Sequence, residues 1–394
     1  MDDLRQHLRE LPCGGRLLDA AAGMTGVYLV GGAVRDLLLG RAPRELDVVV
    51  EGDVNELAAL LGDRSVAHER FGTATVRDGD CRWDLAAARA ETYARPGALP
   101  AVRPAAIEQD LRRRDVSVNA LALDLATGKL RGLPHAEADL AAGRLRVLHD
   151  ASFADDPTRL WRVARYAARL GFELEEHTAQ LAREAVCAGV MDTVSGARIG
   201  NELRLALGEP DPPAALVAAA ALGLAPWLAP DRALTERALE LLPTGEGRRD
   251  LPVLAASLAA PADELLAELQ FTAAERAIVR ACAEAPALGD APQRASELAR
   301  ALHGRPVEAV ALAGACGAAA GAAAARRWLD ELRHVGLQIT GDDLRAAGVA
   351  EGPELGRRLR AVLARRLDGE LADDRAAQLA AALAAAPAPG AATS

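Results

Sequence analysis

The pattern of apolar and polar positions is clearest near the start of the chain, between residues 27 and 53. An apolar, β-branched run at Val27–Val30 predicts a short strand, and the glycine pair that follows breaks it. Residues 33–39 then have helical spacing, and a turn around Pro43 leads into a second strand over residues 45–50. The pattern therefore predicts a strand–helix–strand unit.

The glycine pair between this first strand and the helix is typical of a phosphate-binding turn. Without side chains, Gly31 and Gly32 let the backbone approach an anion, and the free N–H groups at the start of the helix point toward it. Arg35 lies one turn into the helix and adds a fixed positive charge. A plain turn has the same sequence, so the glycines alone do not establish a phosphate site.

Two acidic residues open the second strand. Residues i and i+2 of a strand face the same way, so Glu45 and Asp47 are predicted to present two carboxylates side by side. Paired carboxylates on a rigid strand suit Mg²⁺, which proteins usually hold through one or two carboxylates plus substrate phosphates. With the glycine turn, they predict one place where a triphosphate and its metal ions meet.

Around this unit, the pattern predicts further elements of a mixed domain. Residues 1–26 indicate one amphipathic helix and a linker of small residues, and Val54–Leu61 indicates another helix. Strands are predicted at 68–77 and 81–85, joined by a turn. Asp84 lies on the second of them: an antiparallel pairing would bring its carboxylate beside the first two, and a solvent-facing position is an equally weighted alternative.

A polar motif follows a proline-rich stretch. Three prolines between residues 96 and 104 exclude a continuous helix and predict a loop. Beyond it, an apparent helix ends in three arginines, Arg112 to Arg114, followed by Asp115 and then Asn119. Three adjacent helical residues cannot all face one way, so at least one arginine is expected in solvent or in a structural role. Arginine forks suit triphosphate oxygens, and short polar groups suit a sugar hydroxyl.

A second strong pattern lies within residues 150–178. Asp156 precedes a proline, and an acidic cap followed by proline at the first helical position favours the start of a helix. That helix has arginines at positions 159, 162, 165 and 169, within roughly a third of its circumference, and apolar residues on another face. An ordinary amphipathic helix with a basic stripe would have the same pattern.

From about Ser195 onward the pattern is nearly all helical, with segments separated by proline and glycine. The predicted fold class is an α+β head, a mixed sheet with helices, followed by a mostly α-helical remainder. The predicted divisions are a head at 1–140, a neck at 141–205, a body at 206–300, a tail at 301–385 and a disordered end at 386–394. In the tail, the helix around Gly356 is expected to expose Arg357, Arg358, Arg360, Arg365 and Arg366, either as a solvated face or for contact with the phosphates of a nucleic acid.

The charge, the apolar stretches and the cysteines of the chain indicate which classes of function are to be expected. The net charge of −10 argues weakly against nucleic-acid binding, yet the arginine clusters leave room for a basic face on an acidic body. Because no apolar stretch reaches about 18 residues and the N-terminus lacks a signal-peptide pattern, we expect a cytosolic protein without a membrane partner. The 5 cysteines lack metal-ligand spacing, so we expect buried reduced thiols rather than disulfides or zinc.

In combination, these motifs resemble the class II tRNA nucleotidyltransferases and bacterial poly(A) polymerases, a branch of the DNA polymerase β nucleotidyltransferase superfamily. The resemblance is carried by GGAVRD, Glu-x-Asp, RRDVSVNA and DDPTR, in the family's order, and a stretch at 339–374 resembles the family's tail module. The family usually has Asp-x-Asp, whereas the first acid here is Glu45. The family's flexible segment also departs from its usual form, at residues 132–136.

The resemblance implies a role for each motif. Glu45 and Asp47 would hold Mg²⁺ and act in catalysis with Asp84. The implied nucleotide-binding residues are Gly31, Gly32, Arg35, Arg113, Arg114, Asp115, Asn119, Asp156, Arg159, Arg162 and Arg165. Of these, Asp156 and Arg159 would read the incoming base, the carboxylate accepting from the exocyclic amino group that cytosine and adenine both carry.

The implied activity is template-independent addition of CCA to the 3′ end of tRNA from CTP and ATP, with release of pyrophosphate. Other readings stay open: an enzyme that adds only A or only CC, a poly(A) polymerase, or a tRNA-binding pseudoenzyme. The last is motivated by Glu45 and by the altered segment at 132–136. The sequence predicts no oligomeric state.

Overall fold

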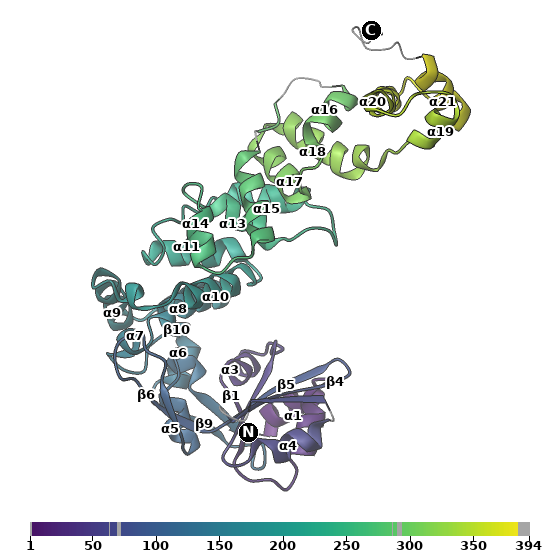
Figure 1. Ribbon diagram of the computed structural model, residues 1–394. Helices are drawn as coiled ribbons and strands as arrows, with labels where there is room; N and C mark the ends of the chain where they lie inside the picture. The colour runs from purple at the N-terminus through teal and green to yellow at the C-terminus, as the bar shows by residue number, and fades with distance from the viewer. Residues whose placement is uncertain (1, 63, 69–71, 286, 290–293, 385–394) are drawn as a thin grey trace. The chain divides into compact units, whose positions relative to one another are not determined.

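The computed structural model describes residues 2–62, 64–68, 72–285, 287–289 and 294–384. It divides into two compact units, Met1–Pro226 and Trp227–Ser394, which are described separately (Figure 1). The first unit contains a mixed sheet with helices and the second is helical, so the predicted fold class is confirmed. The finer division into head, neck, body and tail stays a prediction, and the predicted disordered end lies outside the described residues.

A seven-stranded sheet organises the first unit, in the order β3-β4-β5-β2-β1-β8-β9. Its strands are β1 (Val27–Val30), β2 (Leu46–Val50), β3 (Arg64–His68), β4 (Thr73–Asp78), β5 (Cys81–Ala87), β8 (Leu121–Asp124) and β9 (Leu130–Gly132). β2 and β5 run parallel, whereas the other neighbouring pairs are antiparallel. All four residues of β1 are buried, as expected for a continuous apolar run at the centre of a sheet.

Two small sheets complete the strands of this unit. They pair β6 (Arg89–Thr92) with β7 (Ala101–Pro104), and β10 (Arg144–Leu145) with β11 (Glu173–Leu174). The proline-rich stretch is therefore non-helical, as predicted, but it returns as the second strand of a hairpin instead of remaining a loop. Proline is tolerated there because the strand pairs on one side only.

The helices of the first unit cover the sheet and then continue as a helical layer. They are α1 (Asp2–Glu10), α2 (Gly14–Ala20), α3 (Gly32–Leu38), α4 (Val54–Leu61), α5 (Ile107–Arg112), α6 (Ala136–Ala142), α7 (Ser152–Asp155), α8 (Thr158–Leu170), α9 (Glu176–Cys187), α10 (Gly196–Leu207) and α11 (Pro212–Ala221), with 3₁₀ turns at Ser117–Asn119 and Val190–Thr193. α8 packs against α10 and α11 through a buried face that includes Leu160, Trp161 and Val163.

The packing of α5 against the sheet positions the candidate catalytic residues. Ile107 and Leu111 of α5 pack in one core cluster with Val30 of β1 and Val49 of β2. Since alternate residues of a strand share a face, Asp47 lies on the side of β2 that α5 covers. The chain that leaves α5, with its arginines, therefore passes beside the Asp47 carboxylate.

The second unit is a helical array. Its helices are α12 (Arg232–Leu241), α13 (Asp250–Ser257), α14 (Asp263–Glu268), α15 (Ala273–Glu284), α16 (Ala295–Leu302), α17 (Val307–Cys316), α18 (Ala319–Asp330), α19 (Gly341–Ala346), α20 (Pro353–Leu367) and α21 (Arg375–Ala384), with a 3₁₀ turn at Leu332–His334. One core joins α12 and α15–α18, and a smaller one joins α19–α21. Among the described residues, no helix is both long enough and apolar enough to cross a membrane.

The prediction that α20 exposes five arginines is wrong for three of them. Arg360 and Arg365 are exposed. Arg357, Arg358 and Arg366 are partly buried, the first two because they pair with Glu354 and the third because it pairs with Asp373. Spacing of three and four residues on a helix favours such pairs over solvent exposure.

Two expectations about the N-terminal region also need correction. The linker predicted after the first helix contains a second helix, α2. The strand predicted at 68–77 begins at Thr73, while Arg64–His68 forms a separate strand, and residues 69–71 lie outside the described residues. The small residues of α2 conceal that helix from a search for apolar residues at helical spacing.

The cysteine prediction is wrong for four of the residues. Cys13 and Cys81 form a disulfide, with their Cα atoms 5.4 Å apart across a sequence separation of 68. Cys187 and Cys316 are free but exposed, and Cys282 alone is the buried thiol that we expected. The pairing was not visible in the sequence, because only the sheet brings the start of β5 beside α2.

Candidate active site

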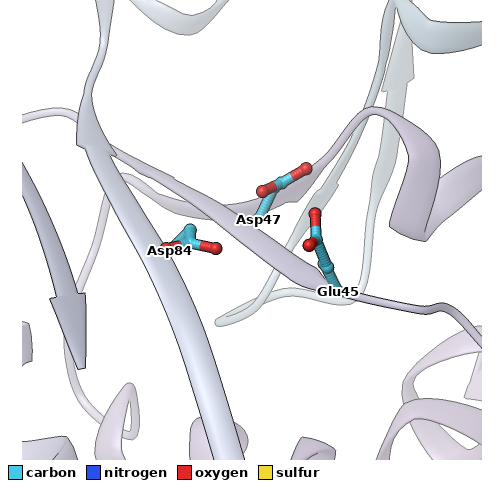
Figure 2. A group of neighbouring side chains, drawn as sticks. All are labelled: Glu45, Asp47 and Asp84. Atoms are coloured by element: carbon cyan, nitrogen blue, oxygen red, sulfur yellow. The ribbon is translucent and has the colours of Figure 1, made fainter. Parts of the chain in front are cut away.

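Three carboxylates meet at the edge where β2 begins (Figure 2). Their ligand oxygens, from Glu45, Asp47 and Asp84, all lie within 4.8 Å of one another. Asp47 and Asp84 are direct partners across the β2–β5 pair, so the predicted third carboxylate is brought to the site. It arrives on a parallel neighbour, not the antiparallel one expected, and Glu45 is exposed just before the strand instead of within it.

Asp47 is less compensated than Asp84 by the groups around it. It accepts no hydrogen bond from the described residues, whereas Asp84 accepts one from the Thr75 hydroxyl at 2.6 Å and pairs with Arg82 at 2.8 Å. Burial raises the pKa of Asp47, and the charge of Glu45 raises it further, against the opposing effect of Arg114. A desolvated carboxylate with two acidic neighbours suits a hard divalent cation.

The glycine turn is shaped by a neighbouring arginine. Gly31 has a φ of +66°, which favours glycine, and a Cβ there would lie 2.6 Å from Nη1 of Arg114. Arg114 is held by a 3.0 Å bond from Nη2 to Asp110, while its buried Nε has no hydrogen-bond partner among the described residues. Arg113 pairs with Asp110 and also with Glu91. The turn and the two arginines therefore form one wall beside the carboxylates.

Arg35 is buried and already bonded within the protein. Its Nε and Nη2 donate to Asp36 at 2.9 and 2.7 Å, and its Nη1 donates to Asn119 at 2.7 Å. The amide nitrogen of Asn119 in turn donates to Asp115. Arg35 and Asn119, both predicted to bind the nucleotide, are therefore hydrogen-bonded to each other, and Asn119 links them to Asp115.

Asp115 connects the sheet to α8. It is only 4% exposed, and it accepts from Arg162 Nε at 2.7 Å, from the Tyr166 hydroxyl at 3.0 Å and from the Val116 N–H at 2.9 Å. Burial alone would raise the pKa of this carboxyl, but Arg162 and the hydrogen bonds hold it well below its usual range. The carboxylate therefore stays ionised and ties the two parts of the unit together.

Asp156 and Arg159 lie on either side of the start of α8. The hydrogen bonds to Asp156 all reach Oδ1: from the Thr158 N–H at 3.1 Å, the Thr158 hydroxyl at 2.7 Å and Arg198 Nη2 at 2.7 Å. Its Oδ2 accepts none from the described residues. Arg159 is 4% exposed and bonds to Ser152 and to the Arg113 carbonyl.

A second ion-pair cluster lies further along α8. Arg165 pairs with Glu202 and Glu209, and Glu209 also lies 3.5 Å from Arg44, the residue that precedes Glu45. Burial raises the pKa of Glu202, and Arg165 opposes that shift. Glu209 Oε2 is buried and accepts no hydrogen bond from the residues that the structure describes. The chain segment that leads into the carboxylate edge is therefore in contact with the end of α10.

One cavity of about 630 Å³ collects most of these side chains. The predicted residues that line it are Gly32, Arg35, Glu45, Asp47, Arg113, Arg114, Asp115, Asn119, Asp156, Arg159, Arg162 and Arg165. Gly31 and Asp84 are the predicted residues outside it. Asp84 instead lines an adjoining cavity of about 330 Å³, which shares Asp47, Arg89, Arg113 and Arg114 with the first.

Sequence reasoning missed the acids and the arginine that support this cavity. Asp110, Glu202, Glu209 and Arg198 each hold a predicted residue in place. The spacing of Asp110 from the arginines at i+3 and i+4 could have revealed its role. The other contacts join segments about 40 residues apart, and no local pattern marks them.

Residues 27–146 match the family model described as the poly A polymerase head domain. The A-adding tRNA nucleotidyltransferase of Geobacter sulfurreducens is 42% identical over 224 residues, which is 55% of this chain and 26% of that relative. The CC-adding tRNA nucleotidyltransferase of Deinococcus radiodurans is 42% identical over 196 residues, 48% of this chain and 51% of that relative. These matches span about half of the second relative and about a quarter of the first.

Similarity to a solved structure extends over nearly the whole chain. The apo form II structure of a CCA-adding enzyme is 28% identical, with a TM-score of 0.78. The match covers 97% of this chain and 95% of that one. The similarity therefore includes the helical second unit as well as the sheet.

Proposed function

Because this chain belongs to the class II family of tRNA nucleotidyltransferases and poly(A) polymerases, we propose that it adds CCA to the 3′ end of tRNA, using CTP, ATP and Mg²⁺. The observation that carries the proposal is the cavity that brings Glu45 and Asp47 together with Asp156 and Arg159. Carboxylates for metal-assisted transfer and groups that can read a base thus line the same space.

In the proposed reaction, the terminal 3′-hydroxyl of tRNA attacks the α-phosphorus of the nucleotide and gives up its proton to solvent. The bond from the α-phosphorus to the bridging oxygen breaks, and pyrophosphate leaves with that oxygen. Mg²⁺ held by Glu45 and Asp47 would supply positive charge where the hydroxyl and the triphosphate meet. The uncompensated Asp47 carboxylate and the 4.8 Å grouping of the acids fit such a cation.

The remaining residues of the chain bind and orient the substrate. We assign the triphosphate to the wall formed by the glycine turn and Arg114, whose Nε has no hydrogen-bond partner within the described part of the chain. Arg113 and Arg35 differ from Arg114 because all three guanidinium nitrogens of each already contact side chains of this chain. Their contribution is to hold this wall in shape and to add charge near it. Asp115 keeps Arg162 and Tyr166 of α8 against the sheet, which fixes the base-reading side of the cavity.

Base selection is assigned to Asp156 and Arg159. Oδ2 of Asp156 is available to accept from the exocyclic amino group of cytosine or adenine, and Arg159 can donate to a ring acceptor. Guanine and uracil present a carbonyl oxygen where the amino group would lie, which repels a carboxylate. Selection therefore needs no nucleic-acid template.

A second candidate is addition of the terminal A alone. The matched Geobacter sulfurreducens relative is named an A-adding enzyme, and its similarity covers 55% of this chain at 42% identity. The same cavity would serve, since adenine carries the amino group that Asp156 accepts from. The two candidates differ in whether CTP is used.

The test is incorporation of single labelled nucleotides into three tRNA transcripts, one without the CCA end, one ending in CC and one complete. CCA addition predicts CTP use on the first and ATP use on the second, with Asp47→Asn inactive on both. ATP use on the second transcript alone identifies the A-adding candidate. No incorporation into any transcript by the unmutated protein would overturn the proposal.

A further inference from the structure

Arg159 differs from the other predicted nucleotide-binding arginines in having no carboxylate partner among the described residues. Arg35, Arg113, Arg114, Arg162 and Arg165 each form an ion pair with an acid of this chain. Within the described ranges, no acid lies at ion-pair distance from Arg159, whose partners there are a hydroxyl and two carbonyl oxygens. The positive charge of Arg159 is therefore available to a ligand. Among the described residues, its hydrogen-bond acceptors are all neutral groups.

The closest of these partners is Ser152. Arg159 Nη1 donates to the Ser152 hydroxyl at 2.7 Å and lies 3.4 Å from the Ser152 carbonyl, while Nη2 donates to the Arg113 carbonyl at 2.7 Å. A guanidinium is planar, with five N–H groups in a fixed fork, so acceptors on both terminal nitrogens set its plane. The N–H of Nε and one N–H of Nη2 remain unused by the described residues.

Ser152 itself is fully buried and does not line the cavity. The one hydrogen bond that its hydroxyl makes within the described residues is the bond from Arg159. It begins α7, the four-residue helix that ends directly before Asp156. A single short segment therefore carries both Asp156 and the acceptor that orients Arg159.

We propose that Ser152 is a specificity-determining positioning residue, whose hydroxyl sets the plane of Arg159 for discrimination between nucleotide bases. This inference rests on the proposed function, in which Asp156 and Arg159 read the base. With the hydroxyl present, the arginine is oriented before the nucleotide arrives, so little side-chain freedom is lost on binding. Without the hydroxyl, Nη1 of Arg159 retains only the longer contact to the Ser152 carbonyl.

The test compares Ser152→Ala with Ser257→Ala. Ser257 is a matched control, because it is also a buried helical serine whose hydroxyl bonds to a single partner, the Val253 carbonyl in the second unit. For Ser152→Ala we expect KM for the accepted nucleotide to rise about tenfold with kcat within about twofold, since a hydrogen bond to a charged group is lost. Preference for ATP or CTP over GTP and UTP should fall several-fold, whereas the control should match the unmutated protein.

Equilibrium binding of the four nucleotides, measured without tRNA, separates this inference from the proposed function. Loss of base preference on Ser152→Ala, in binding and in incorporation, supports it. If the unmutated protein incorporates nothing but binds ATP or CTP with a preference that Ser152→Ala loses, the proposed function fails and the role of Ser152 stands. If Ser152→Ala keeps the base preference of the unmutated protein, the inference is overturned, whatever the activity.

Discussion

Replacing Asp47 should make the metal-free protein more stable while removing its response to Mg²⁺. Asp47 is desolvated, accepts no hydrogen bond from the described residues and lies between Glu45 and Asp84. The substitution Asp47→Asn keeps the shape of the side chain but removes the charge that these neighbours repel. The acids that prepare the site for a cation therefore destabilise the fold when the cation is absent.

The size of this gain in stability follows from the separation of the carboxylates. At 4.8 Å, the upper limit of the distances among the three ligand oxygens, two unit charges repel by about 0.9 kcal/mol at the permittivity of water and about 3.5 kcal/mol at an effective permittivity of 20. Attraction to Arg114 offsets part of this, and solvent screens the exposed Glu45. We expect a net gain of about 1–2 kcal/mol, or about 2–8 °C in Tm for a unit of this size.

The sign of the pH dependence follows from the raised pKa of Asp47. Above that pKa, the carboxylate is charged in both states and its charge opposes folding. As pH falls through the folded pKa, the folded protein takes up the proton first, and the penalty is lost by the time pH reaches the ordinary value of 3.8. The advantage of Asp47→Asn should therefore be largest at neutral pH and disappear under acid conditions.

Scanning calorimetry measures the gain in stability in EDTA and the loss of the response to Mg²⁺ when excess Mg²⁺ is added. Asp124→Asn is the control, because Asp124 lies on the same sheet but accepts from the N–H groups of Ala126 and Thr127. It should lower Tm and leave the shift caused by Mg²⁺ intact. A lower Tm for Asp47→Asn than for the unmutated protein in EDTA would show that the Asp47 charge does not destabilise the fold.

Two further predictions concern stability of the first unit. Tyr166→Phe removes the hydroxyl that donates to buried Asp115 at 3.0 Å, so urea unfolding should show a loss of about 1.5 kcal/mol; an unchanged midpoint would contradict the assigned role of that bond. Cys13→Ser removes the disulfide to Cys81, which closes a long loop, so the first unit should lose about 2–4 kcal/mol, measured by calorimetry. Reductant should have the same effect on the unmutated protein and none on the variant, and a variant that melts like the oxidised protein would contradict it.

Local sequence patterns predicted the elements that carry the chemistry. The run at Val27–Val30 and the helix at Val54–Leu61 appear where apolar spacing places them. α8 begins close to its predicted start, but its cap is Pro157 and not Asp156, which caps the end of α7 instead. These features depend on neighbours within a few residues, so a single sequence contains the necessary information. The resemblance to a family added the grouping of distant motifs, which periodicity alone does not give.

What the sequence did not show depends on contacts between distant segments. The parallel register that joins Asp47 to Asp84 is decided by the whole sheet, and the disulfide at Cys13 follows from the same arrangement. Glu209 and Arg198 reach the site only because α10 packs against α8. Their charges are ordinary for surface helices, and no spacing distinguishes them until the fold brings them together.

We propose that the carboxylate edge performs the transfer while the start of α8 selects the base. The most direct test is the single-turnover rate of incorporation into tRNA ending in CC, with each of the four nucleotides, for the unmutated protein, Asp47→Asn and Asp156→Ala. We expect that Asp47→Asn incorporates no nucleotide, and that Asp156→Ala still incorporates ATP but loses much of its preference over GTP. If Asp47→Asn remained active, or if Asp156→Ala kept the full preference for ATP, the roles assigned to these two carboxylates would be wrong.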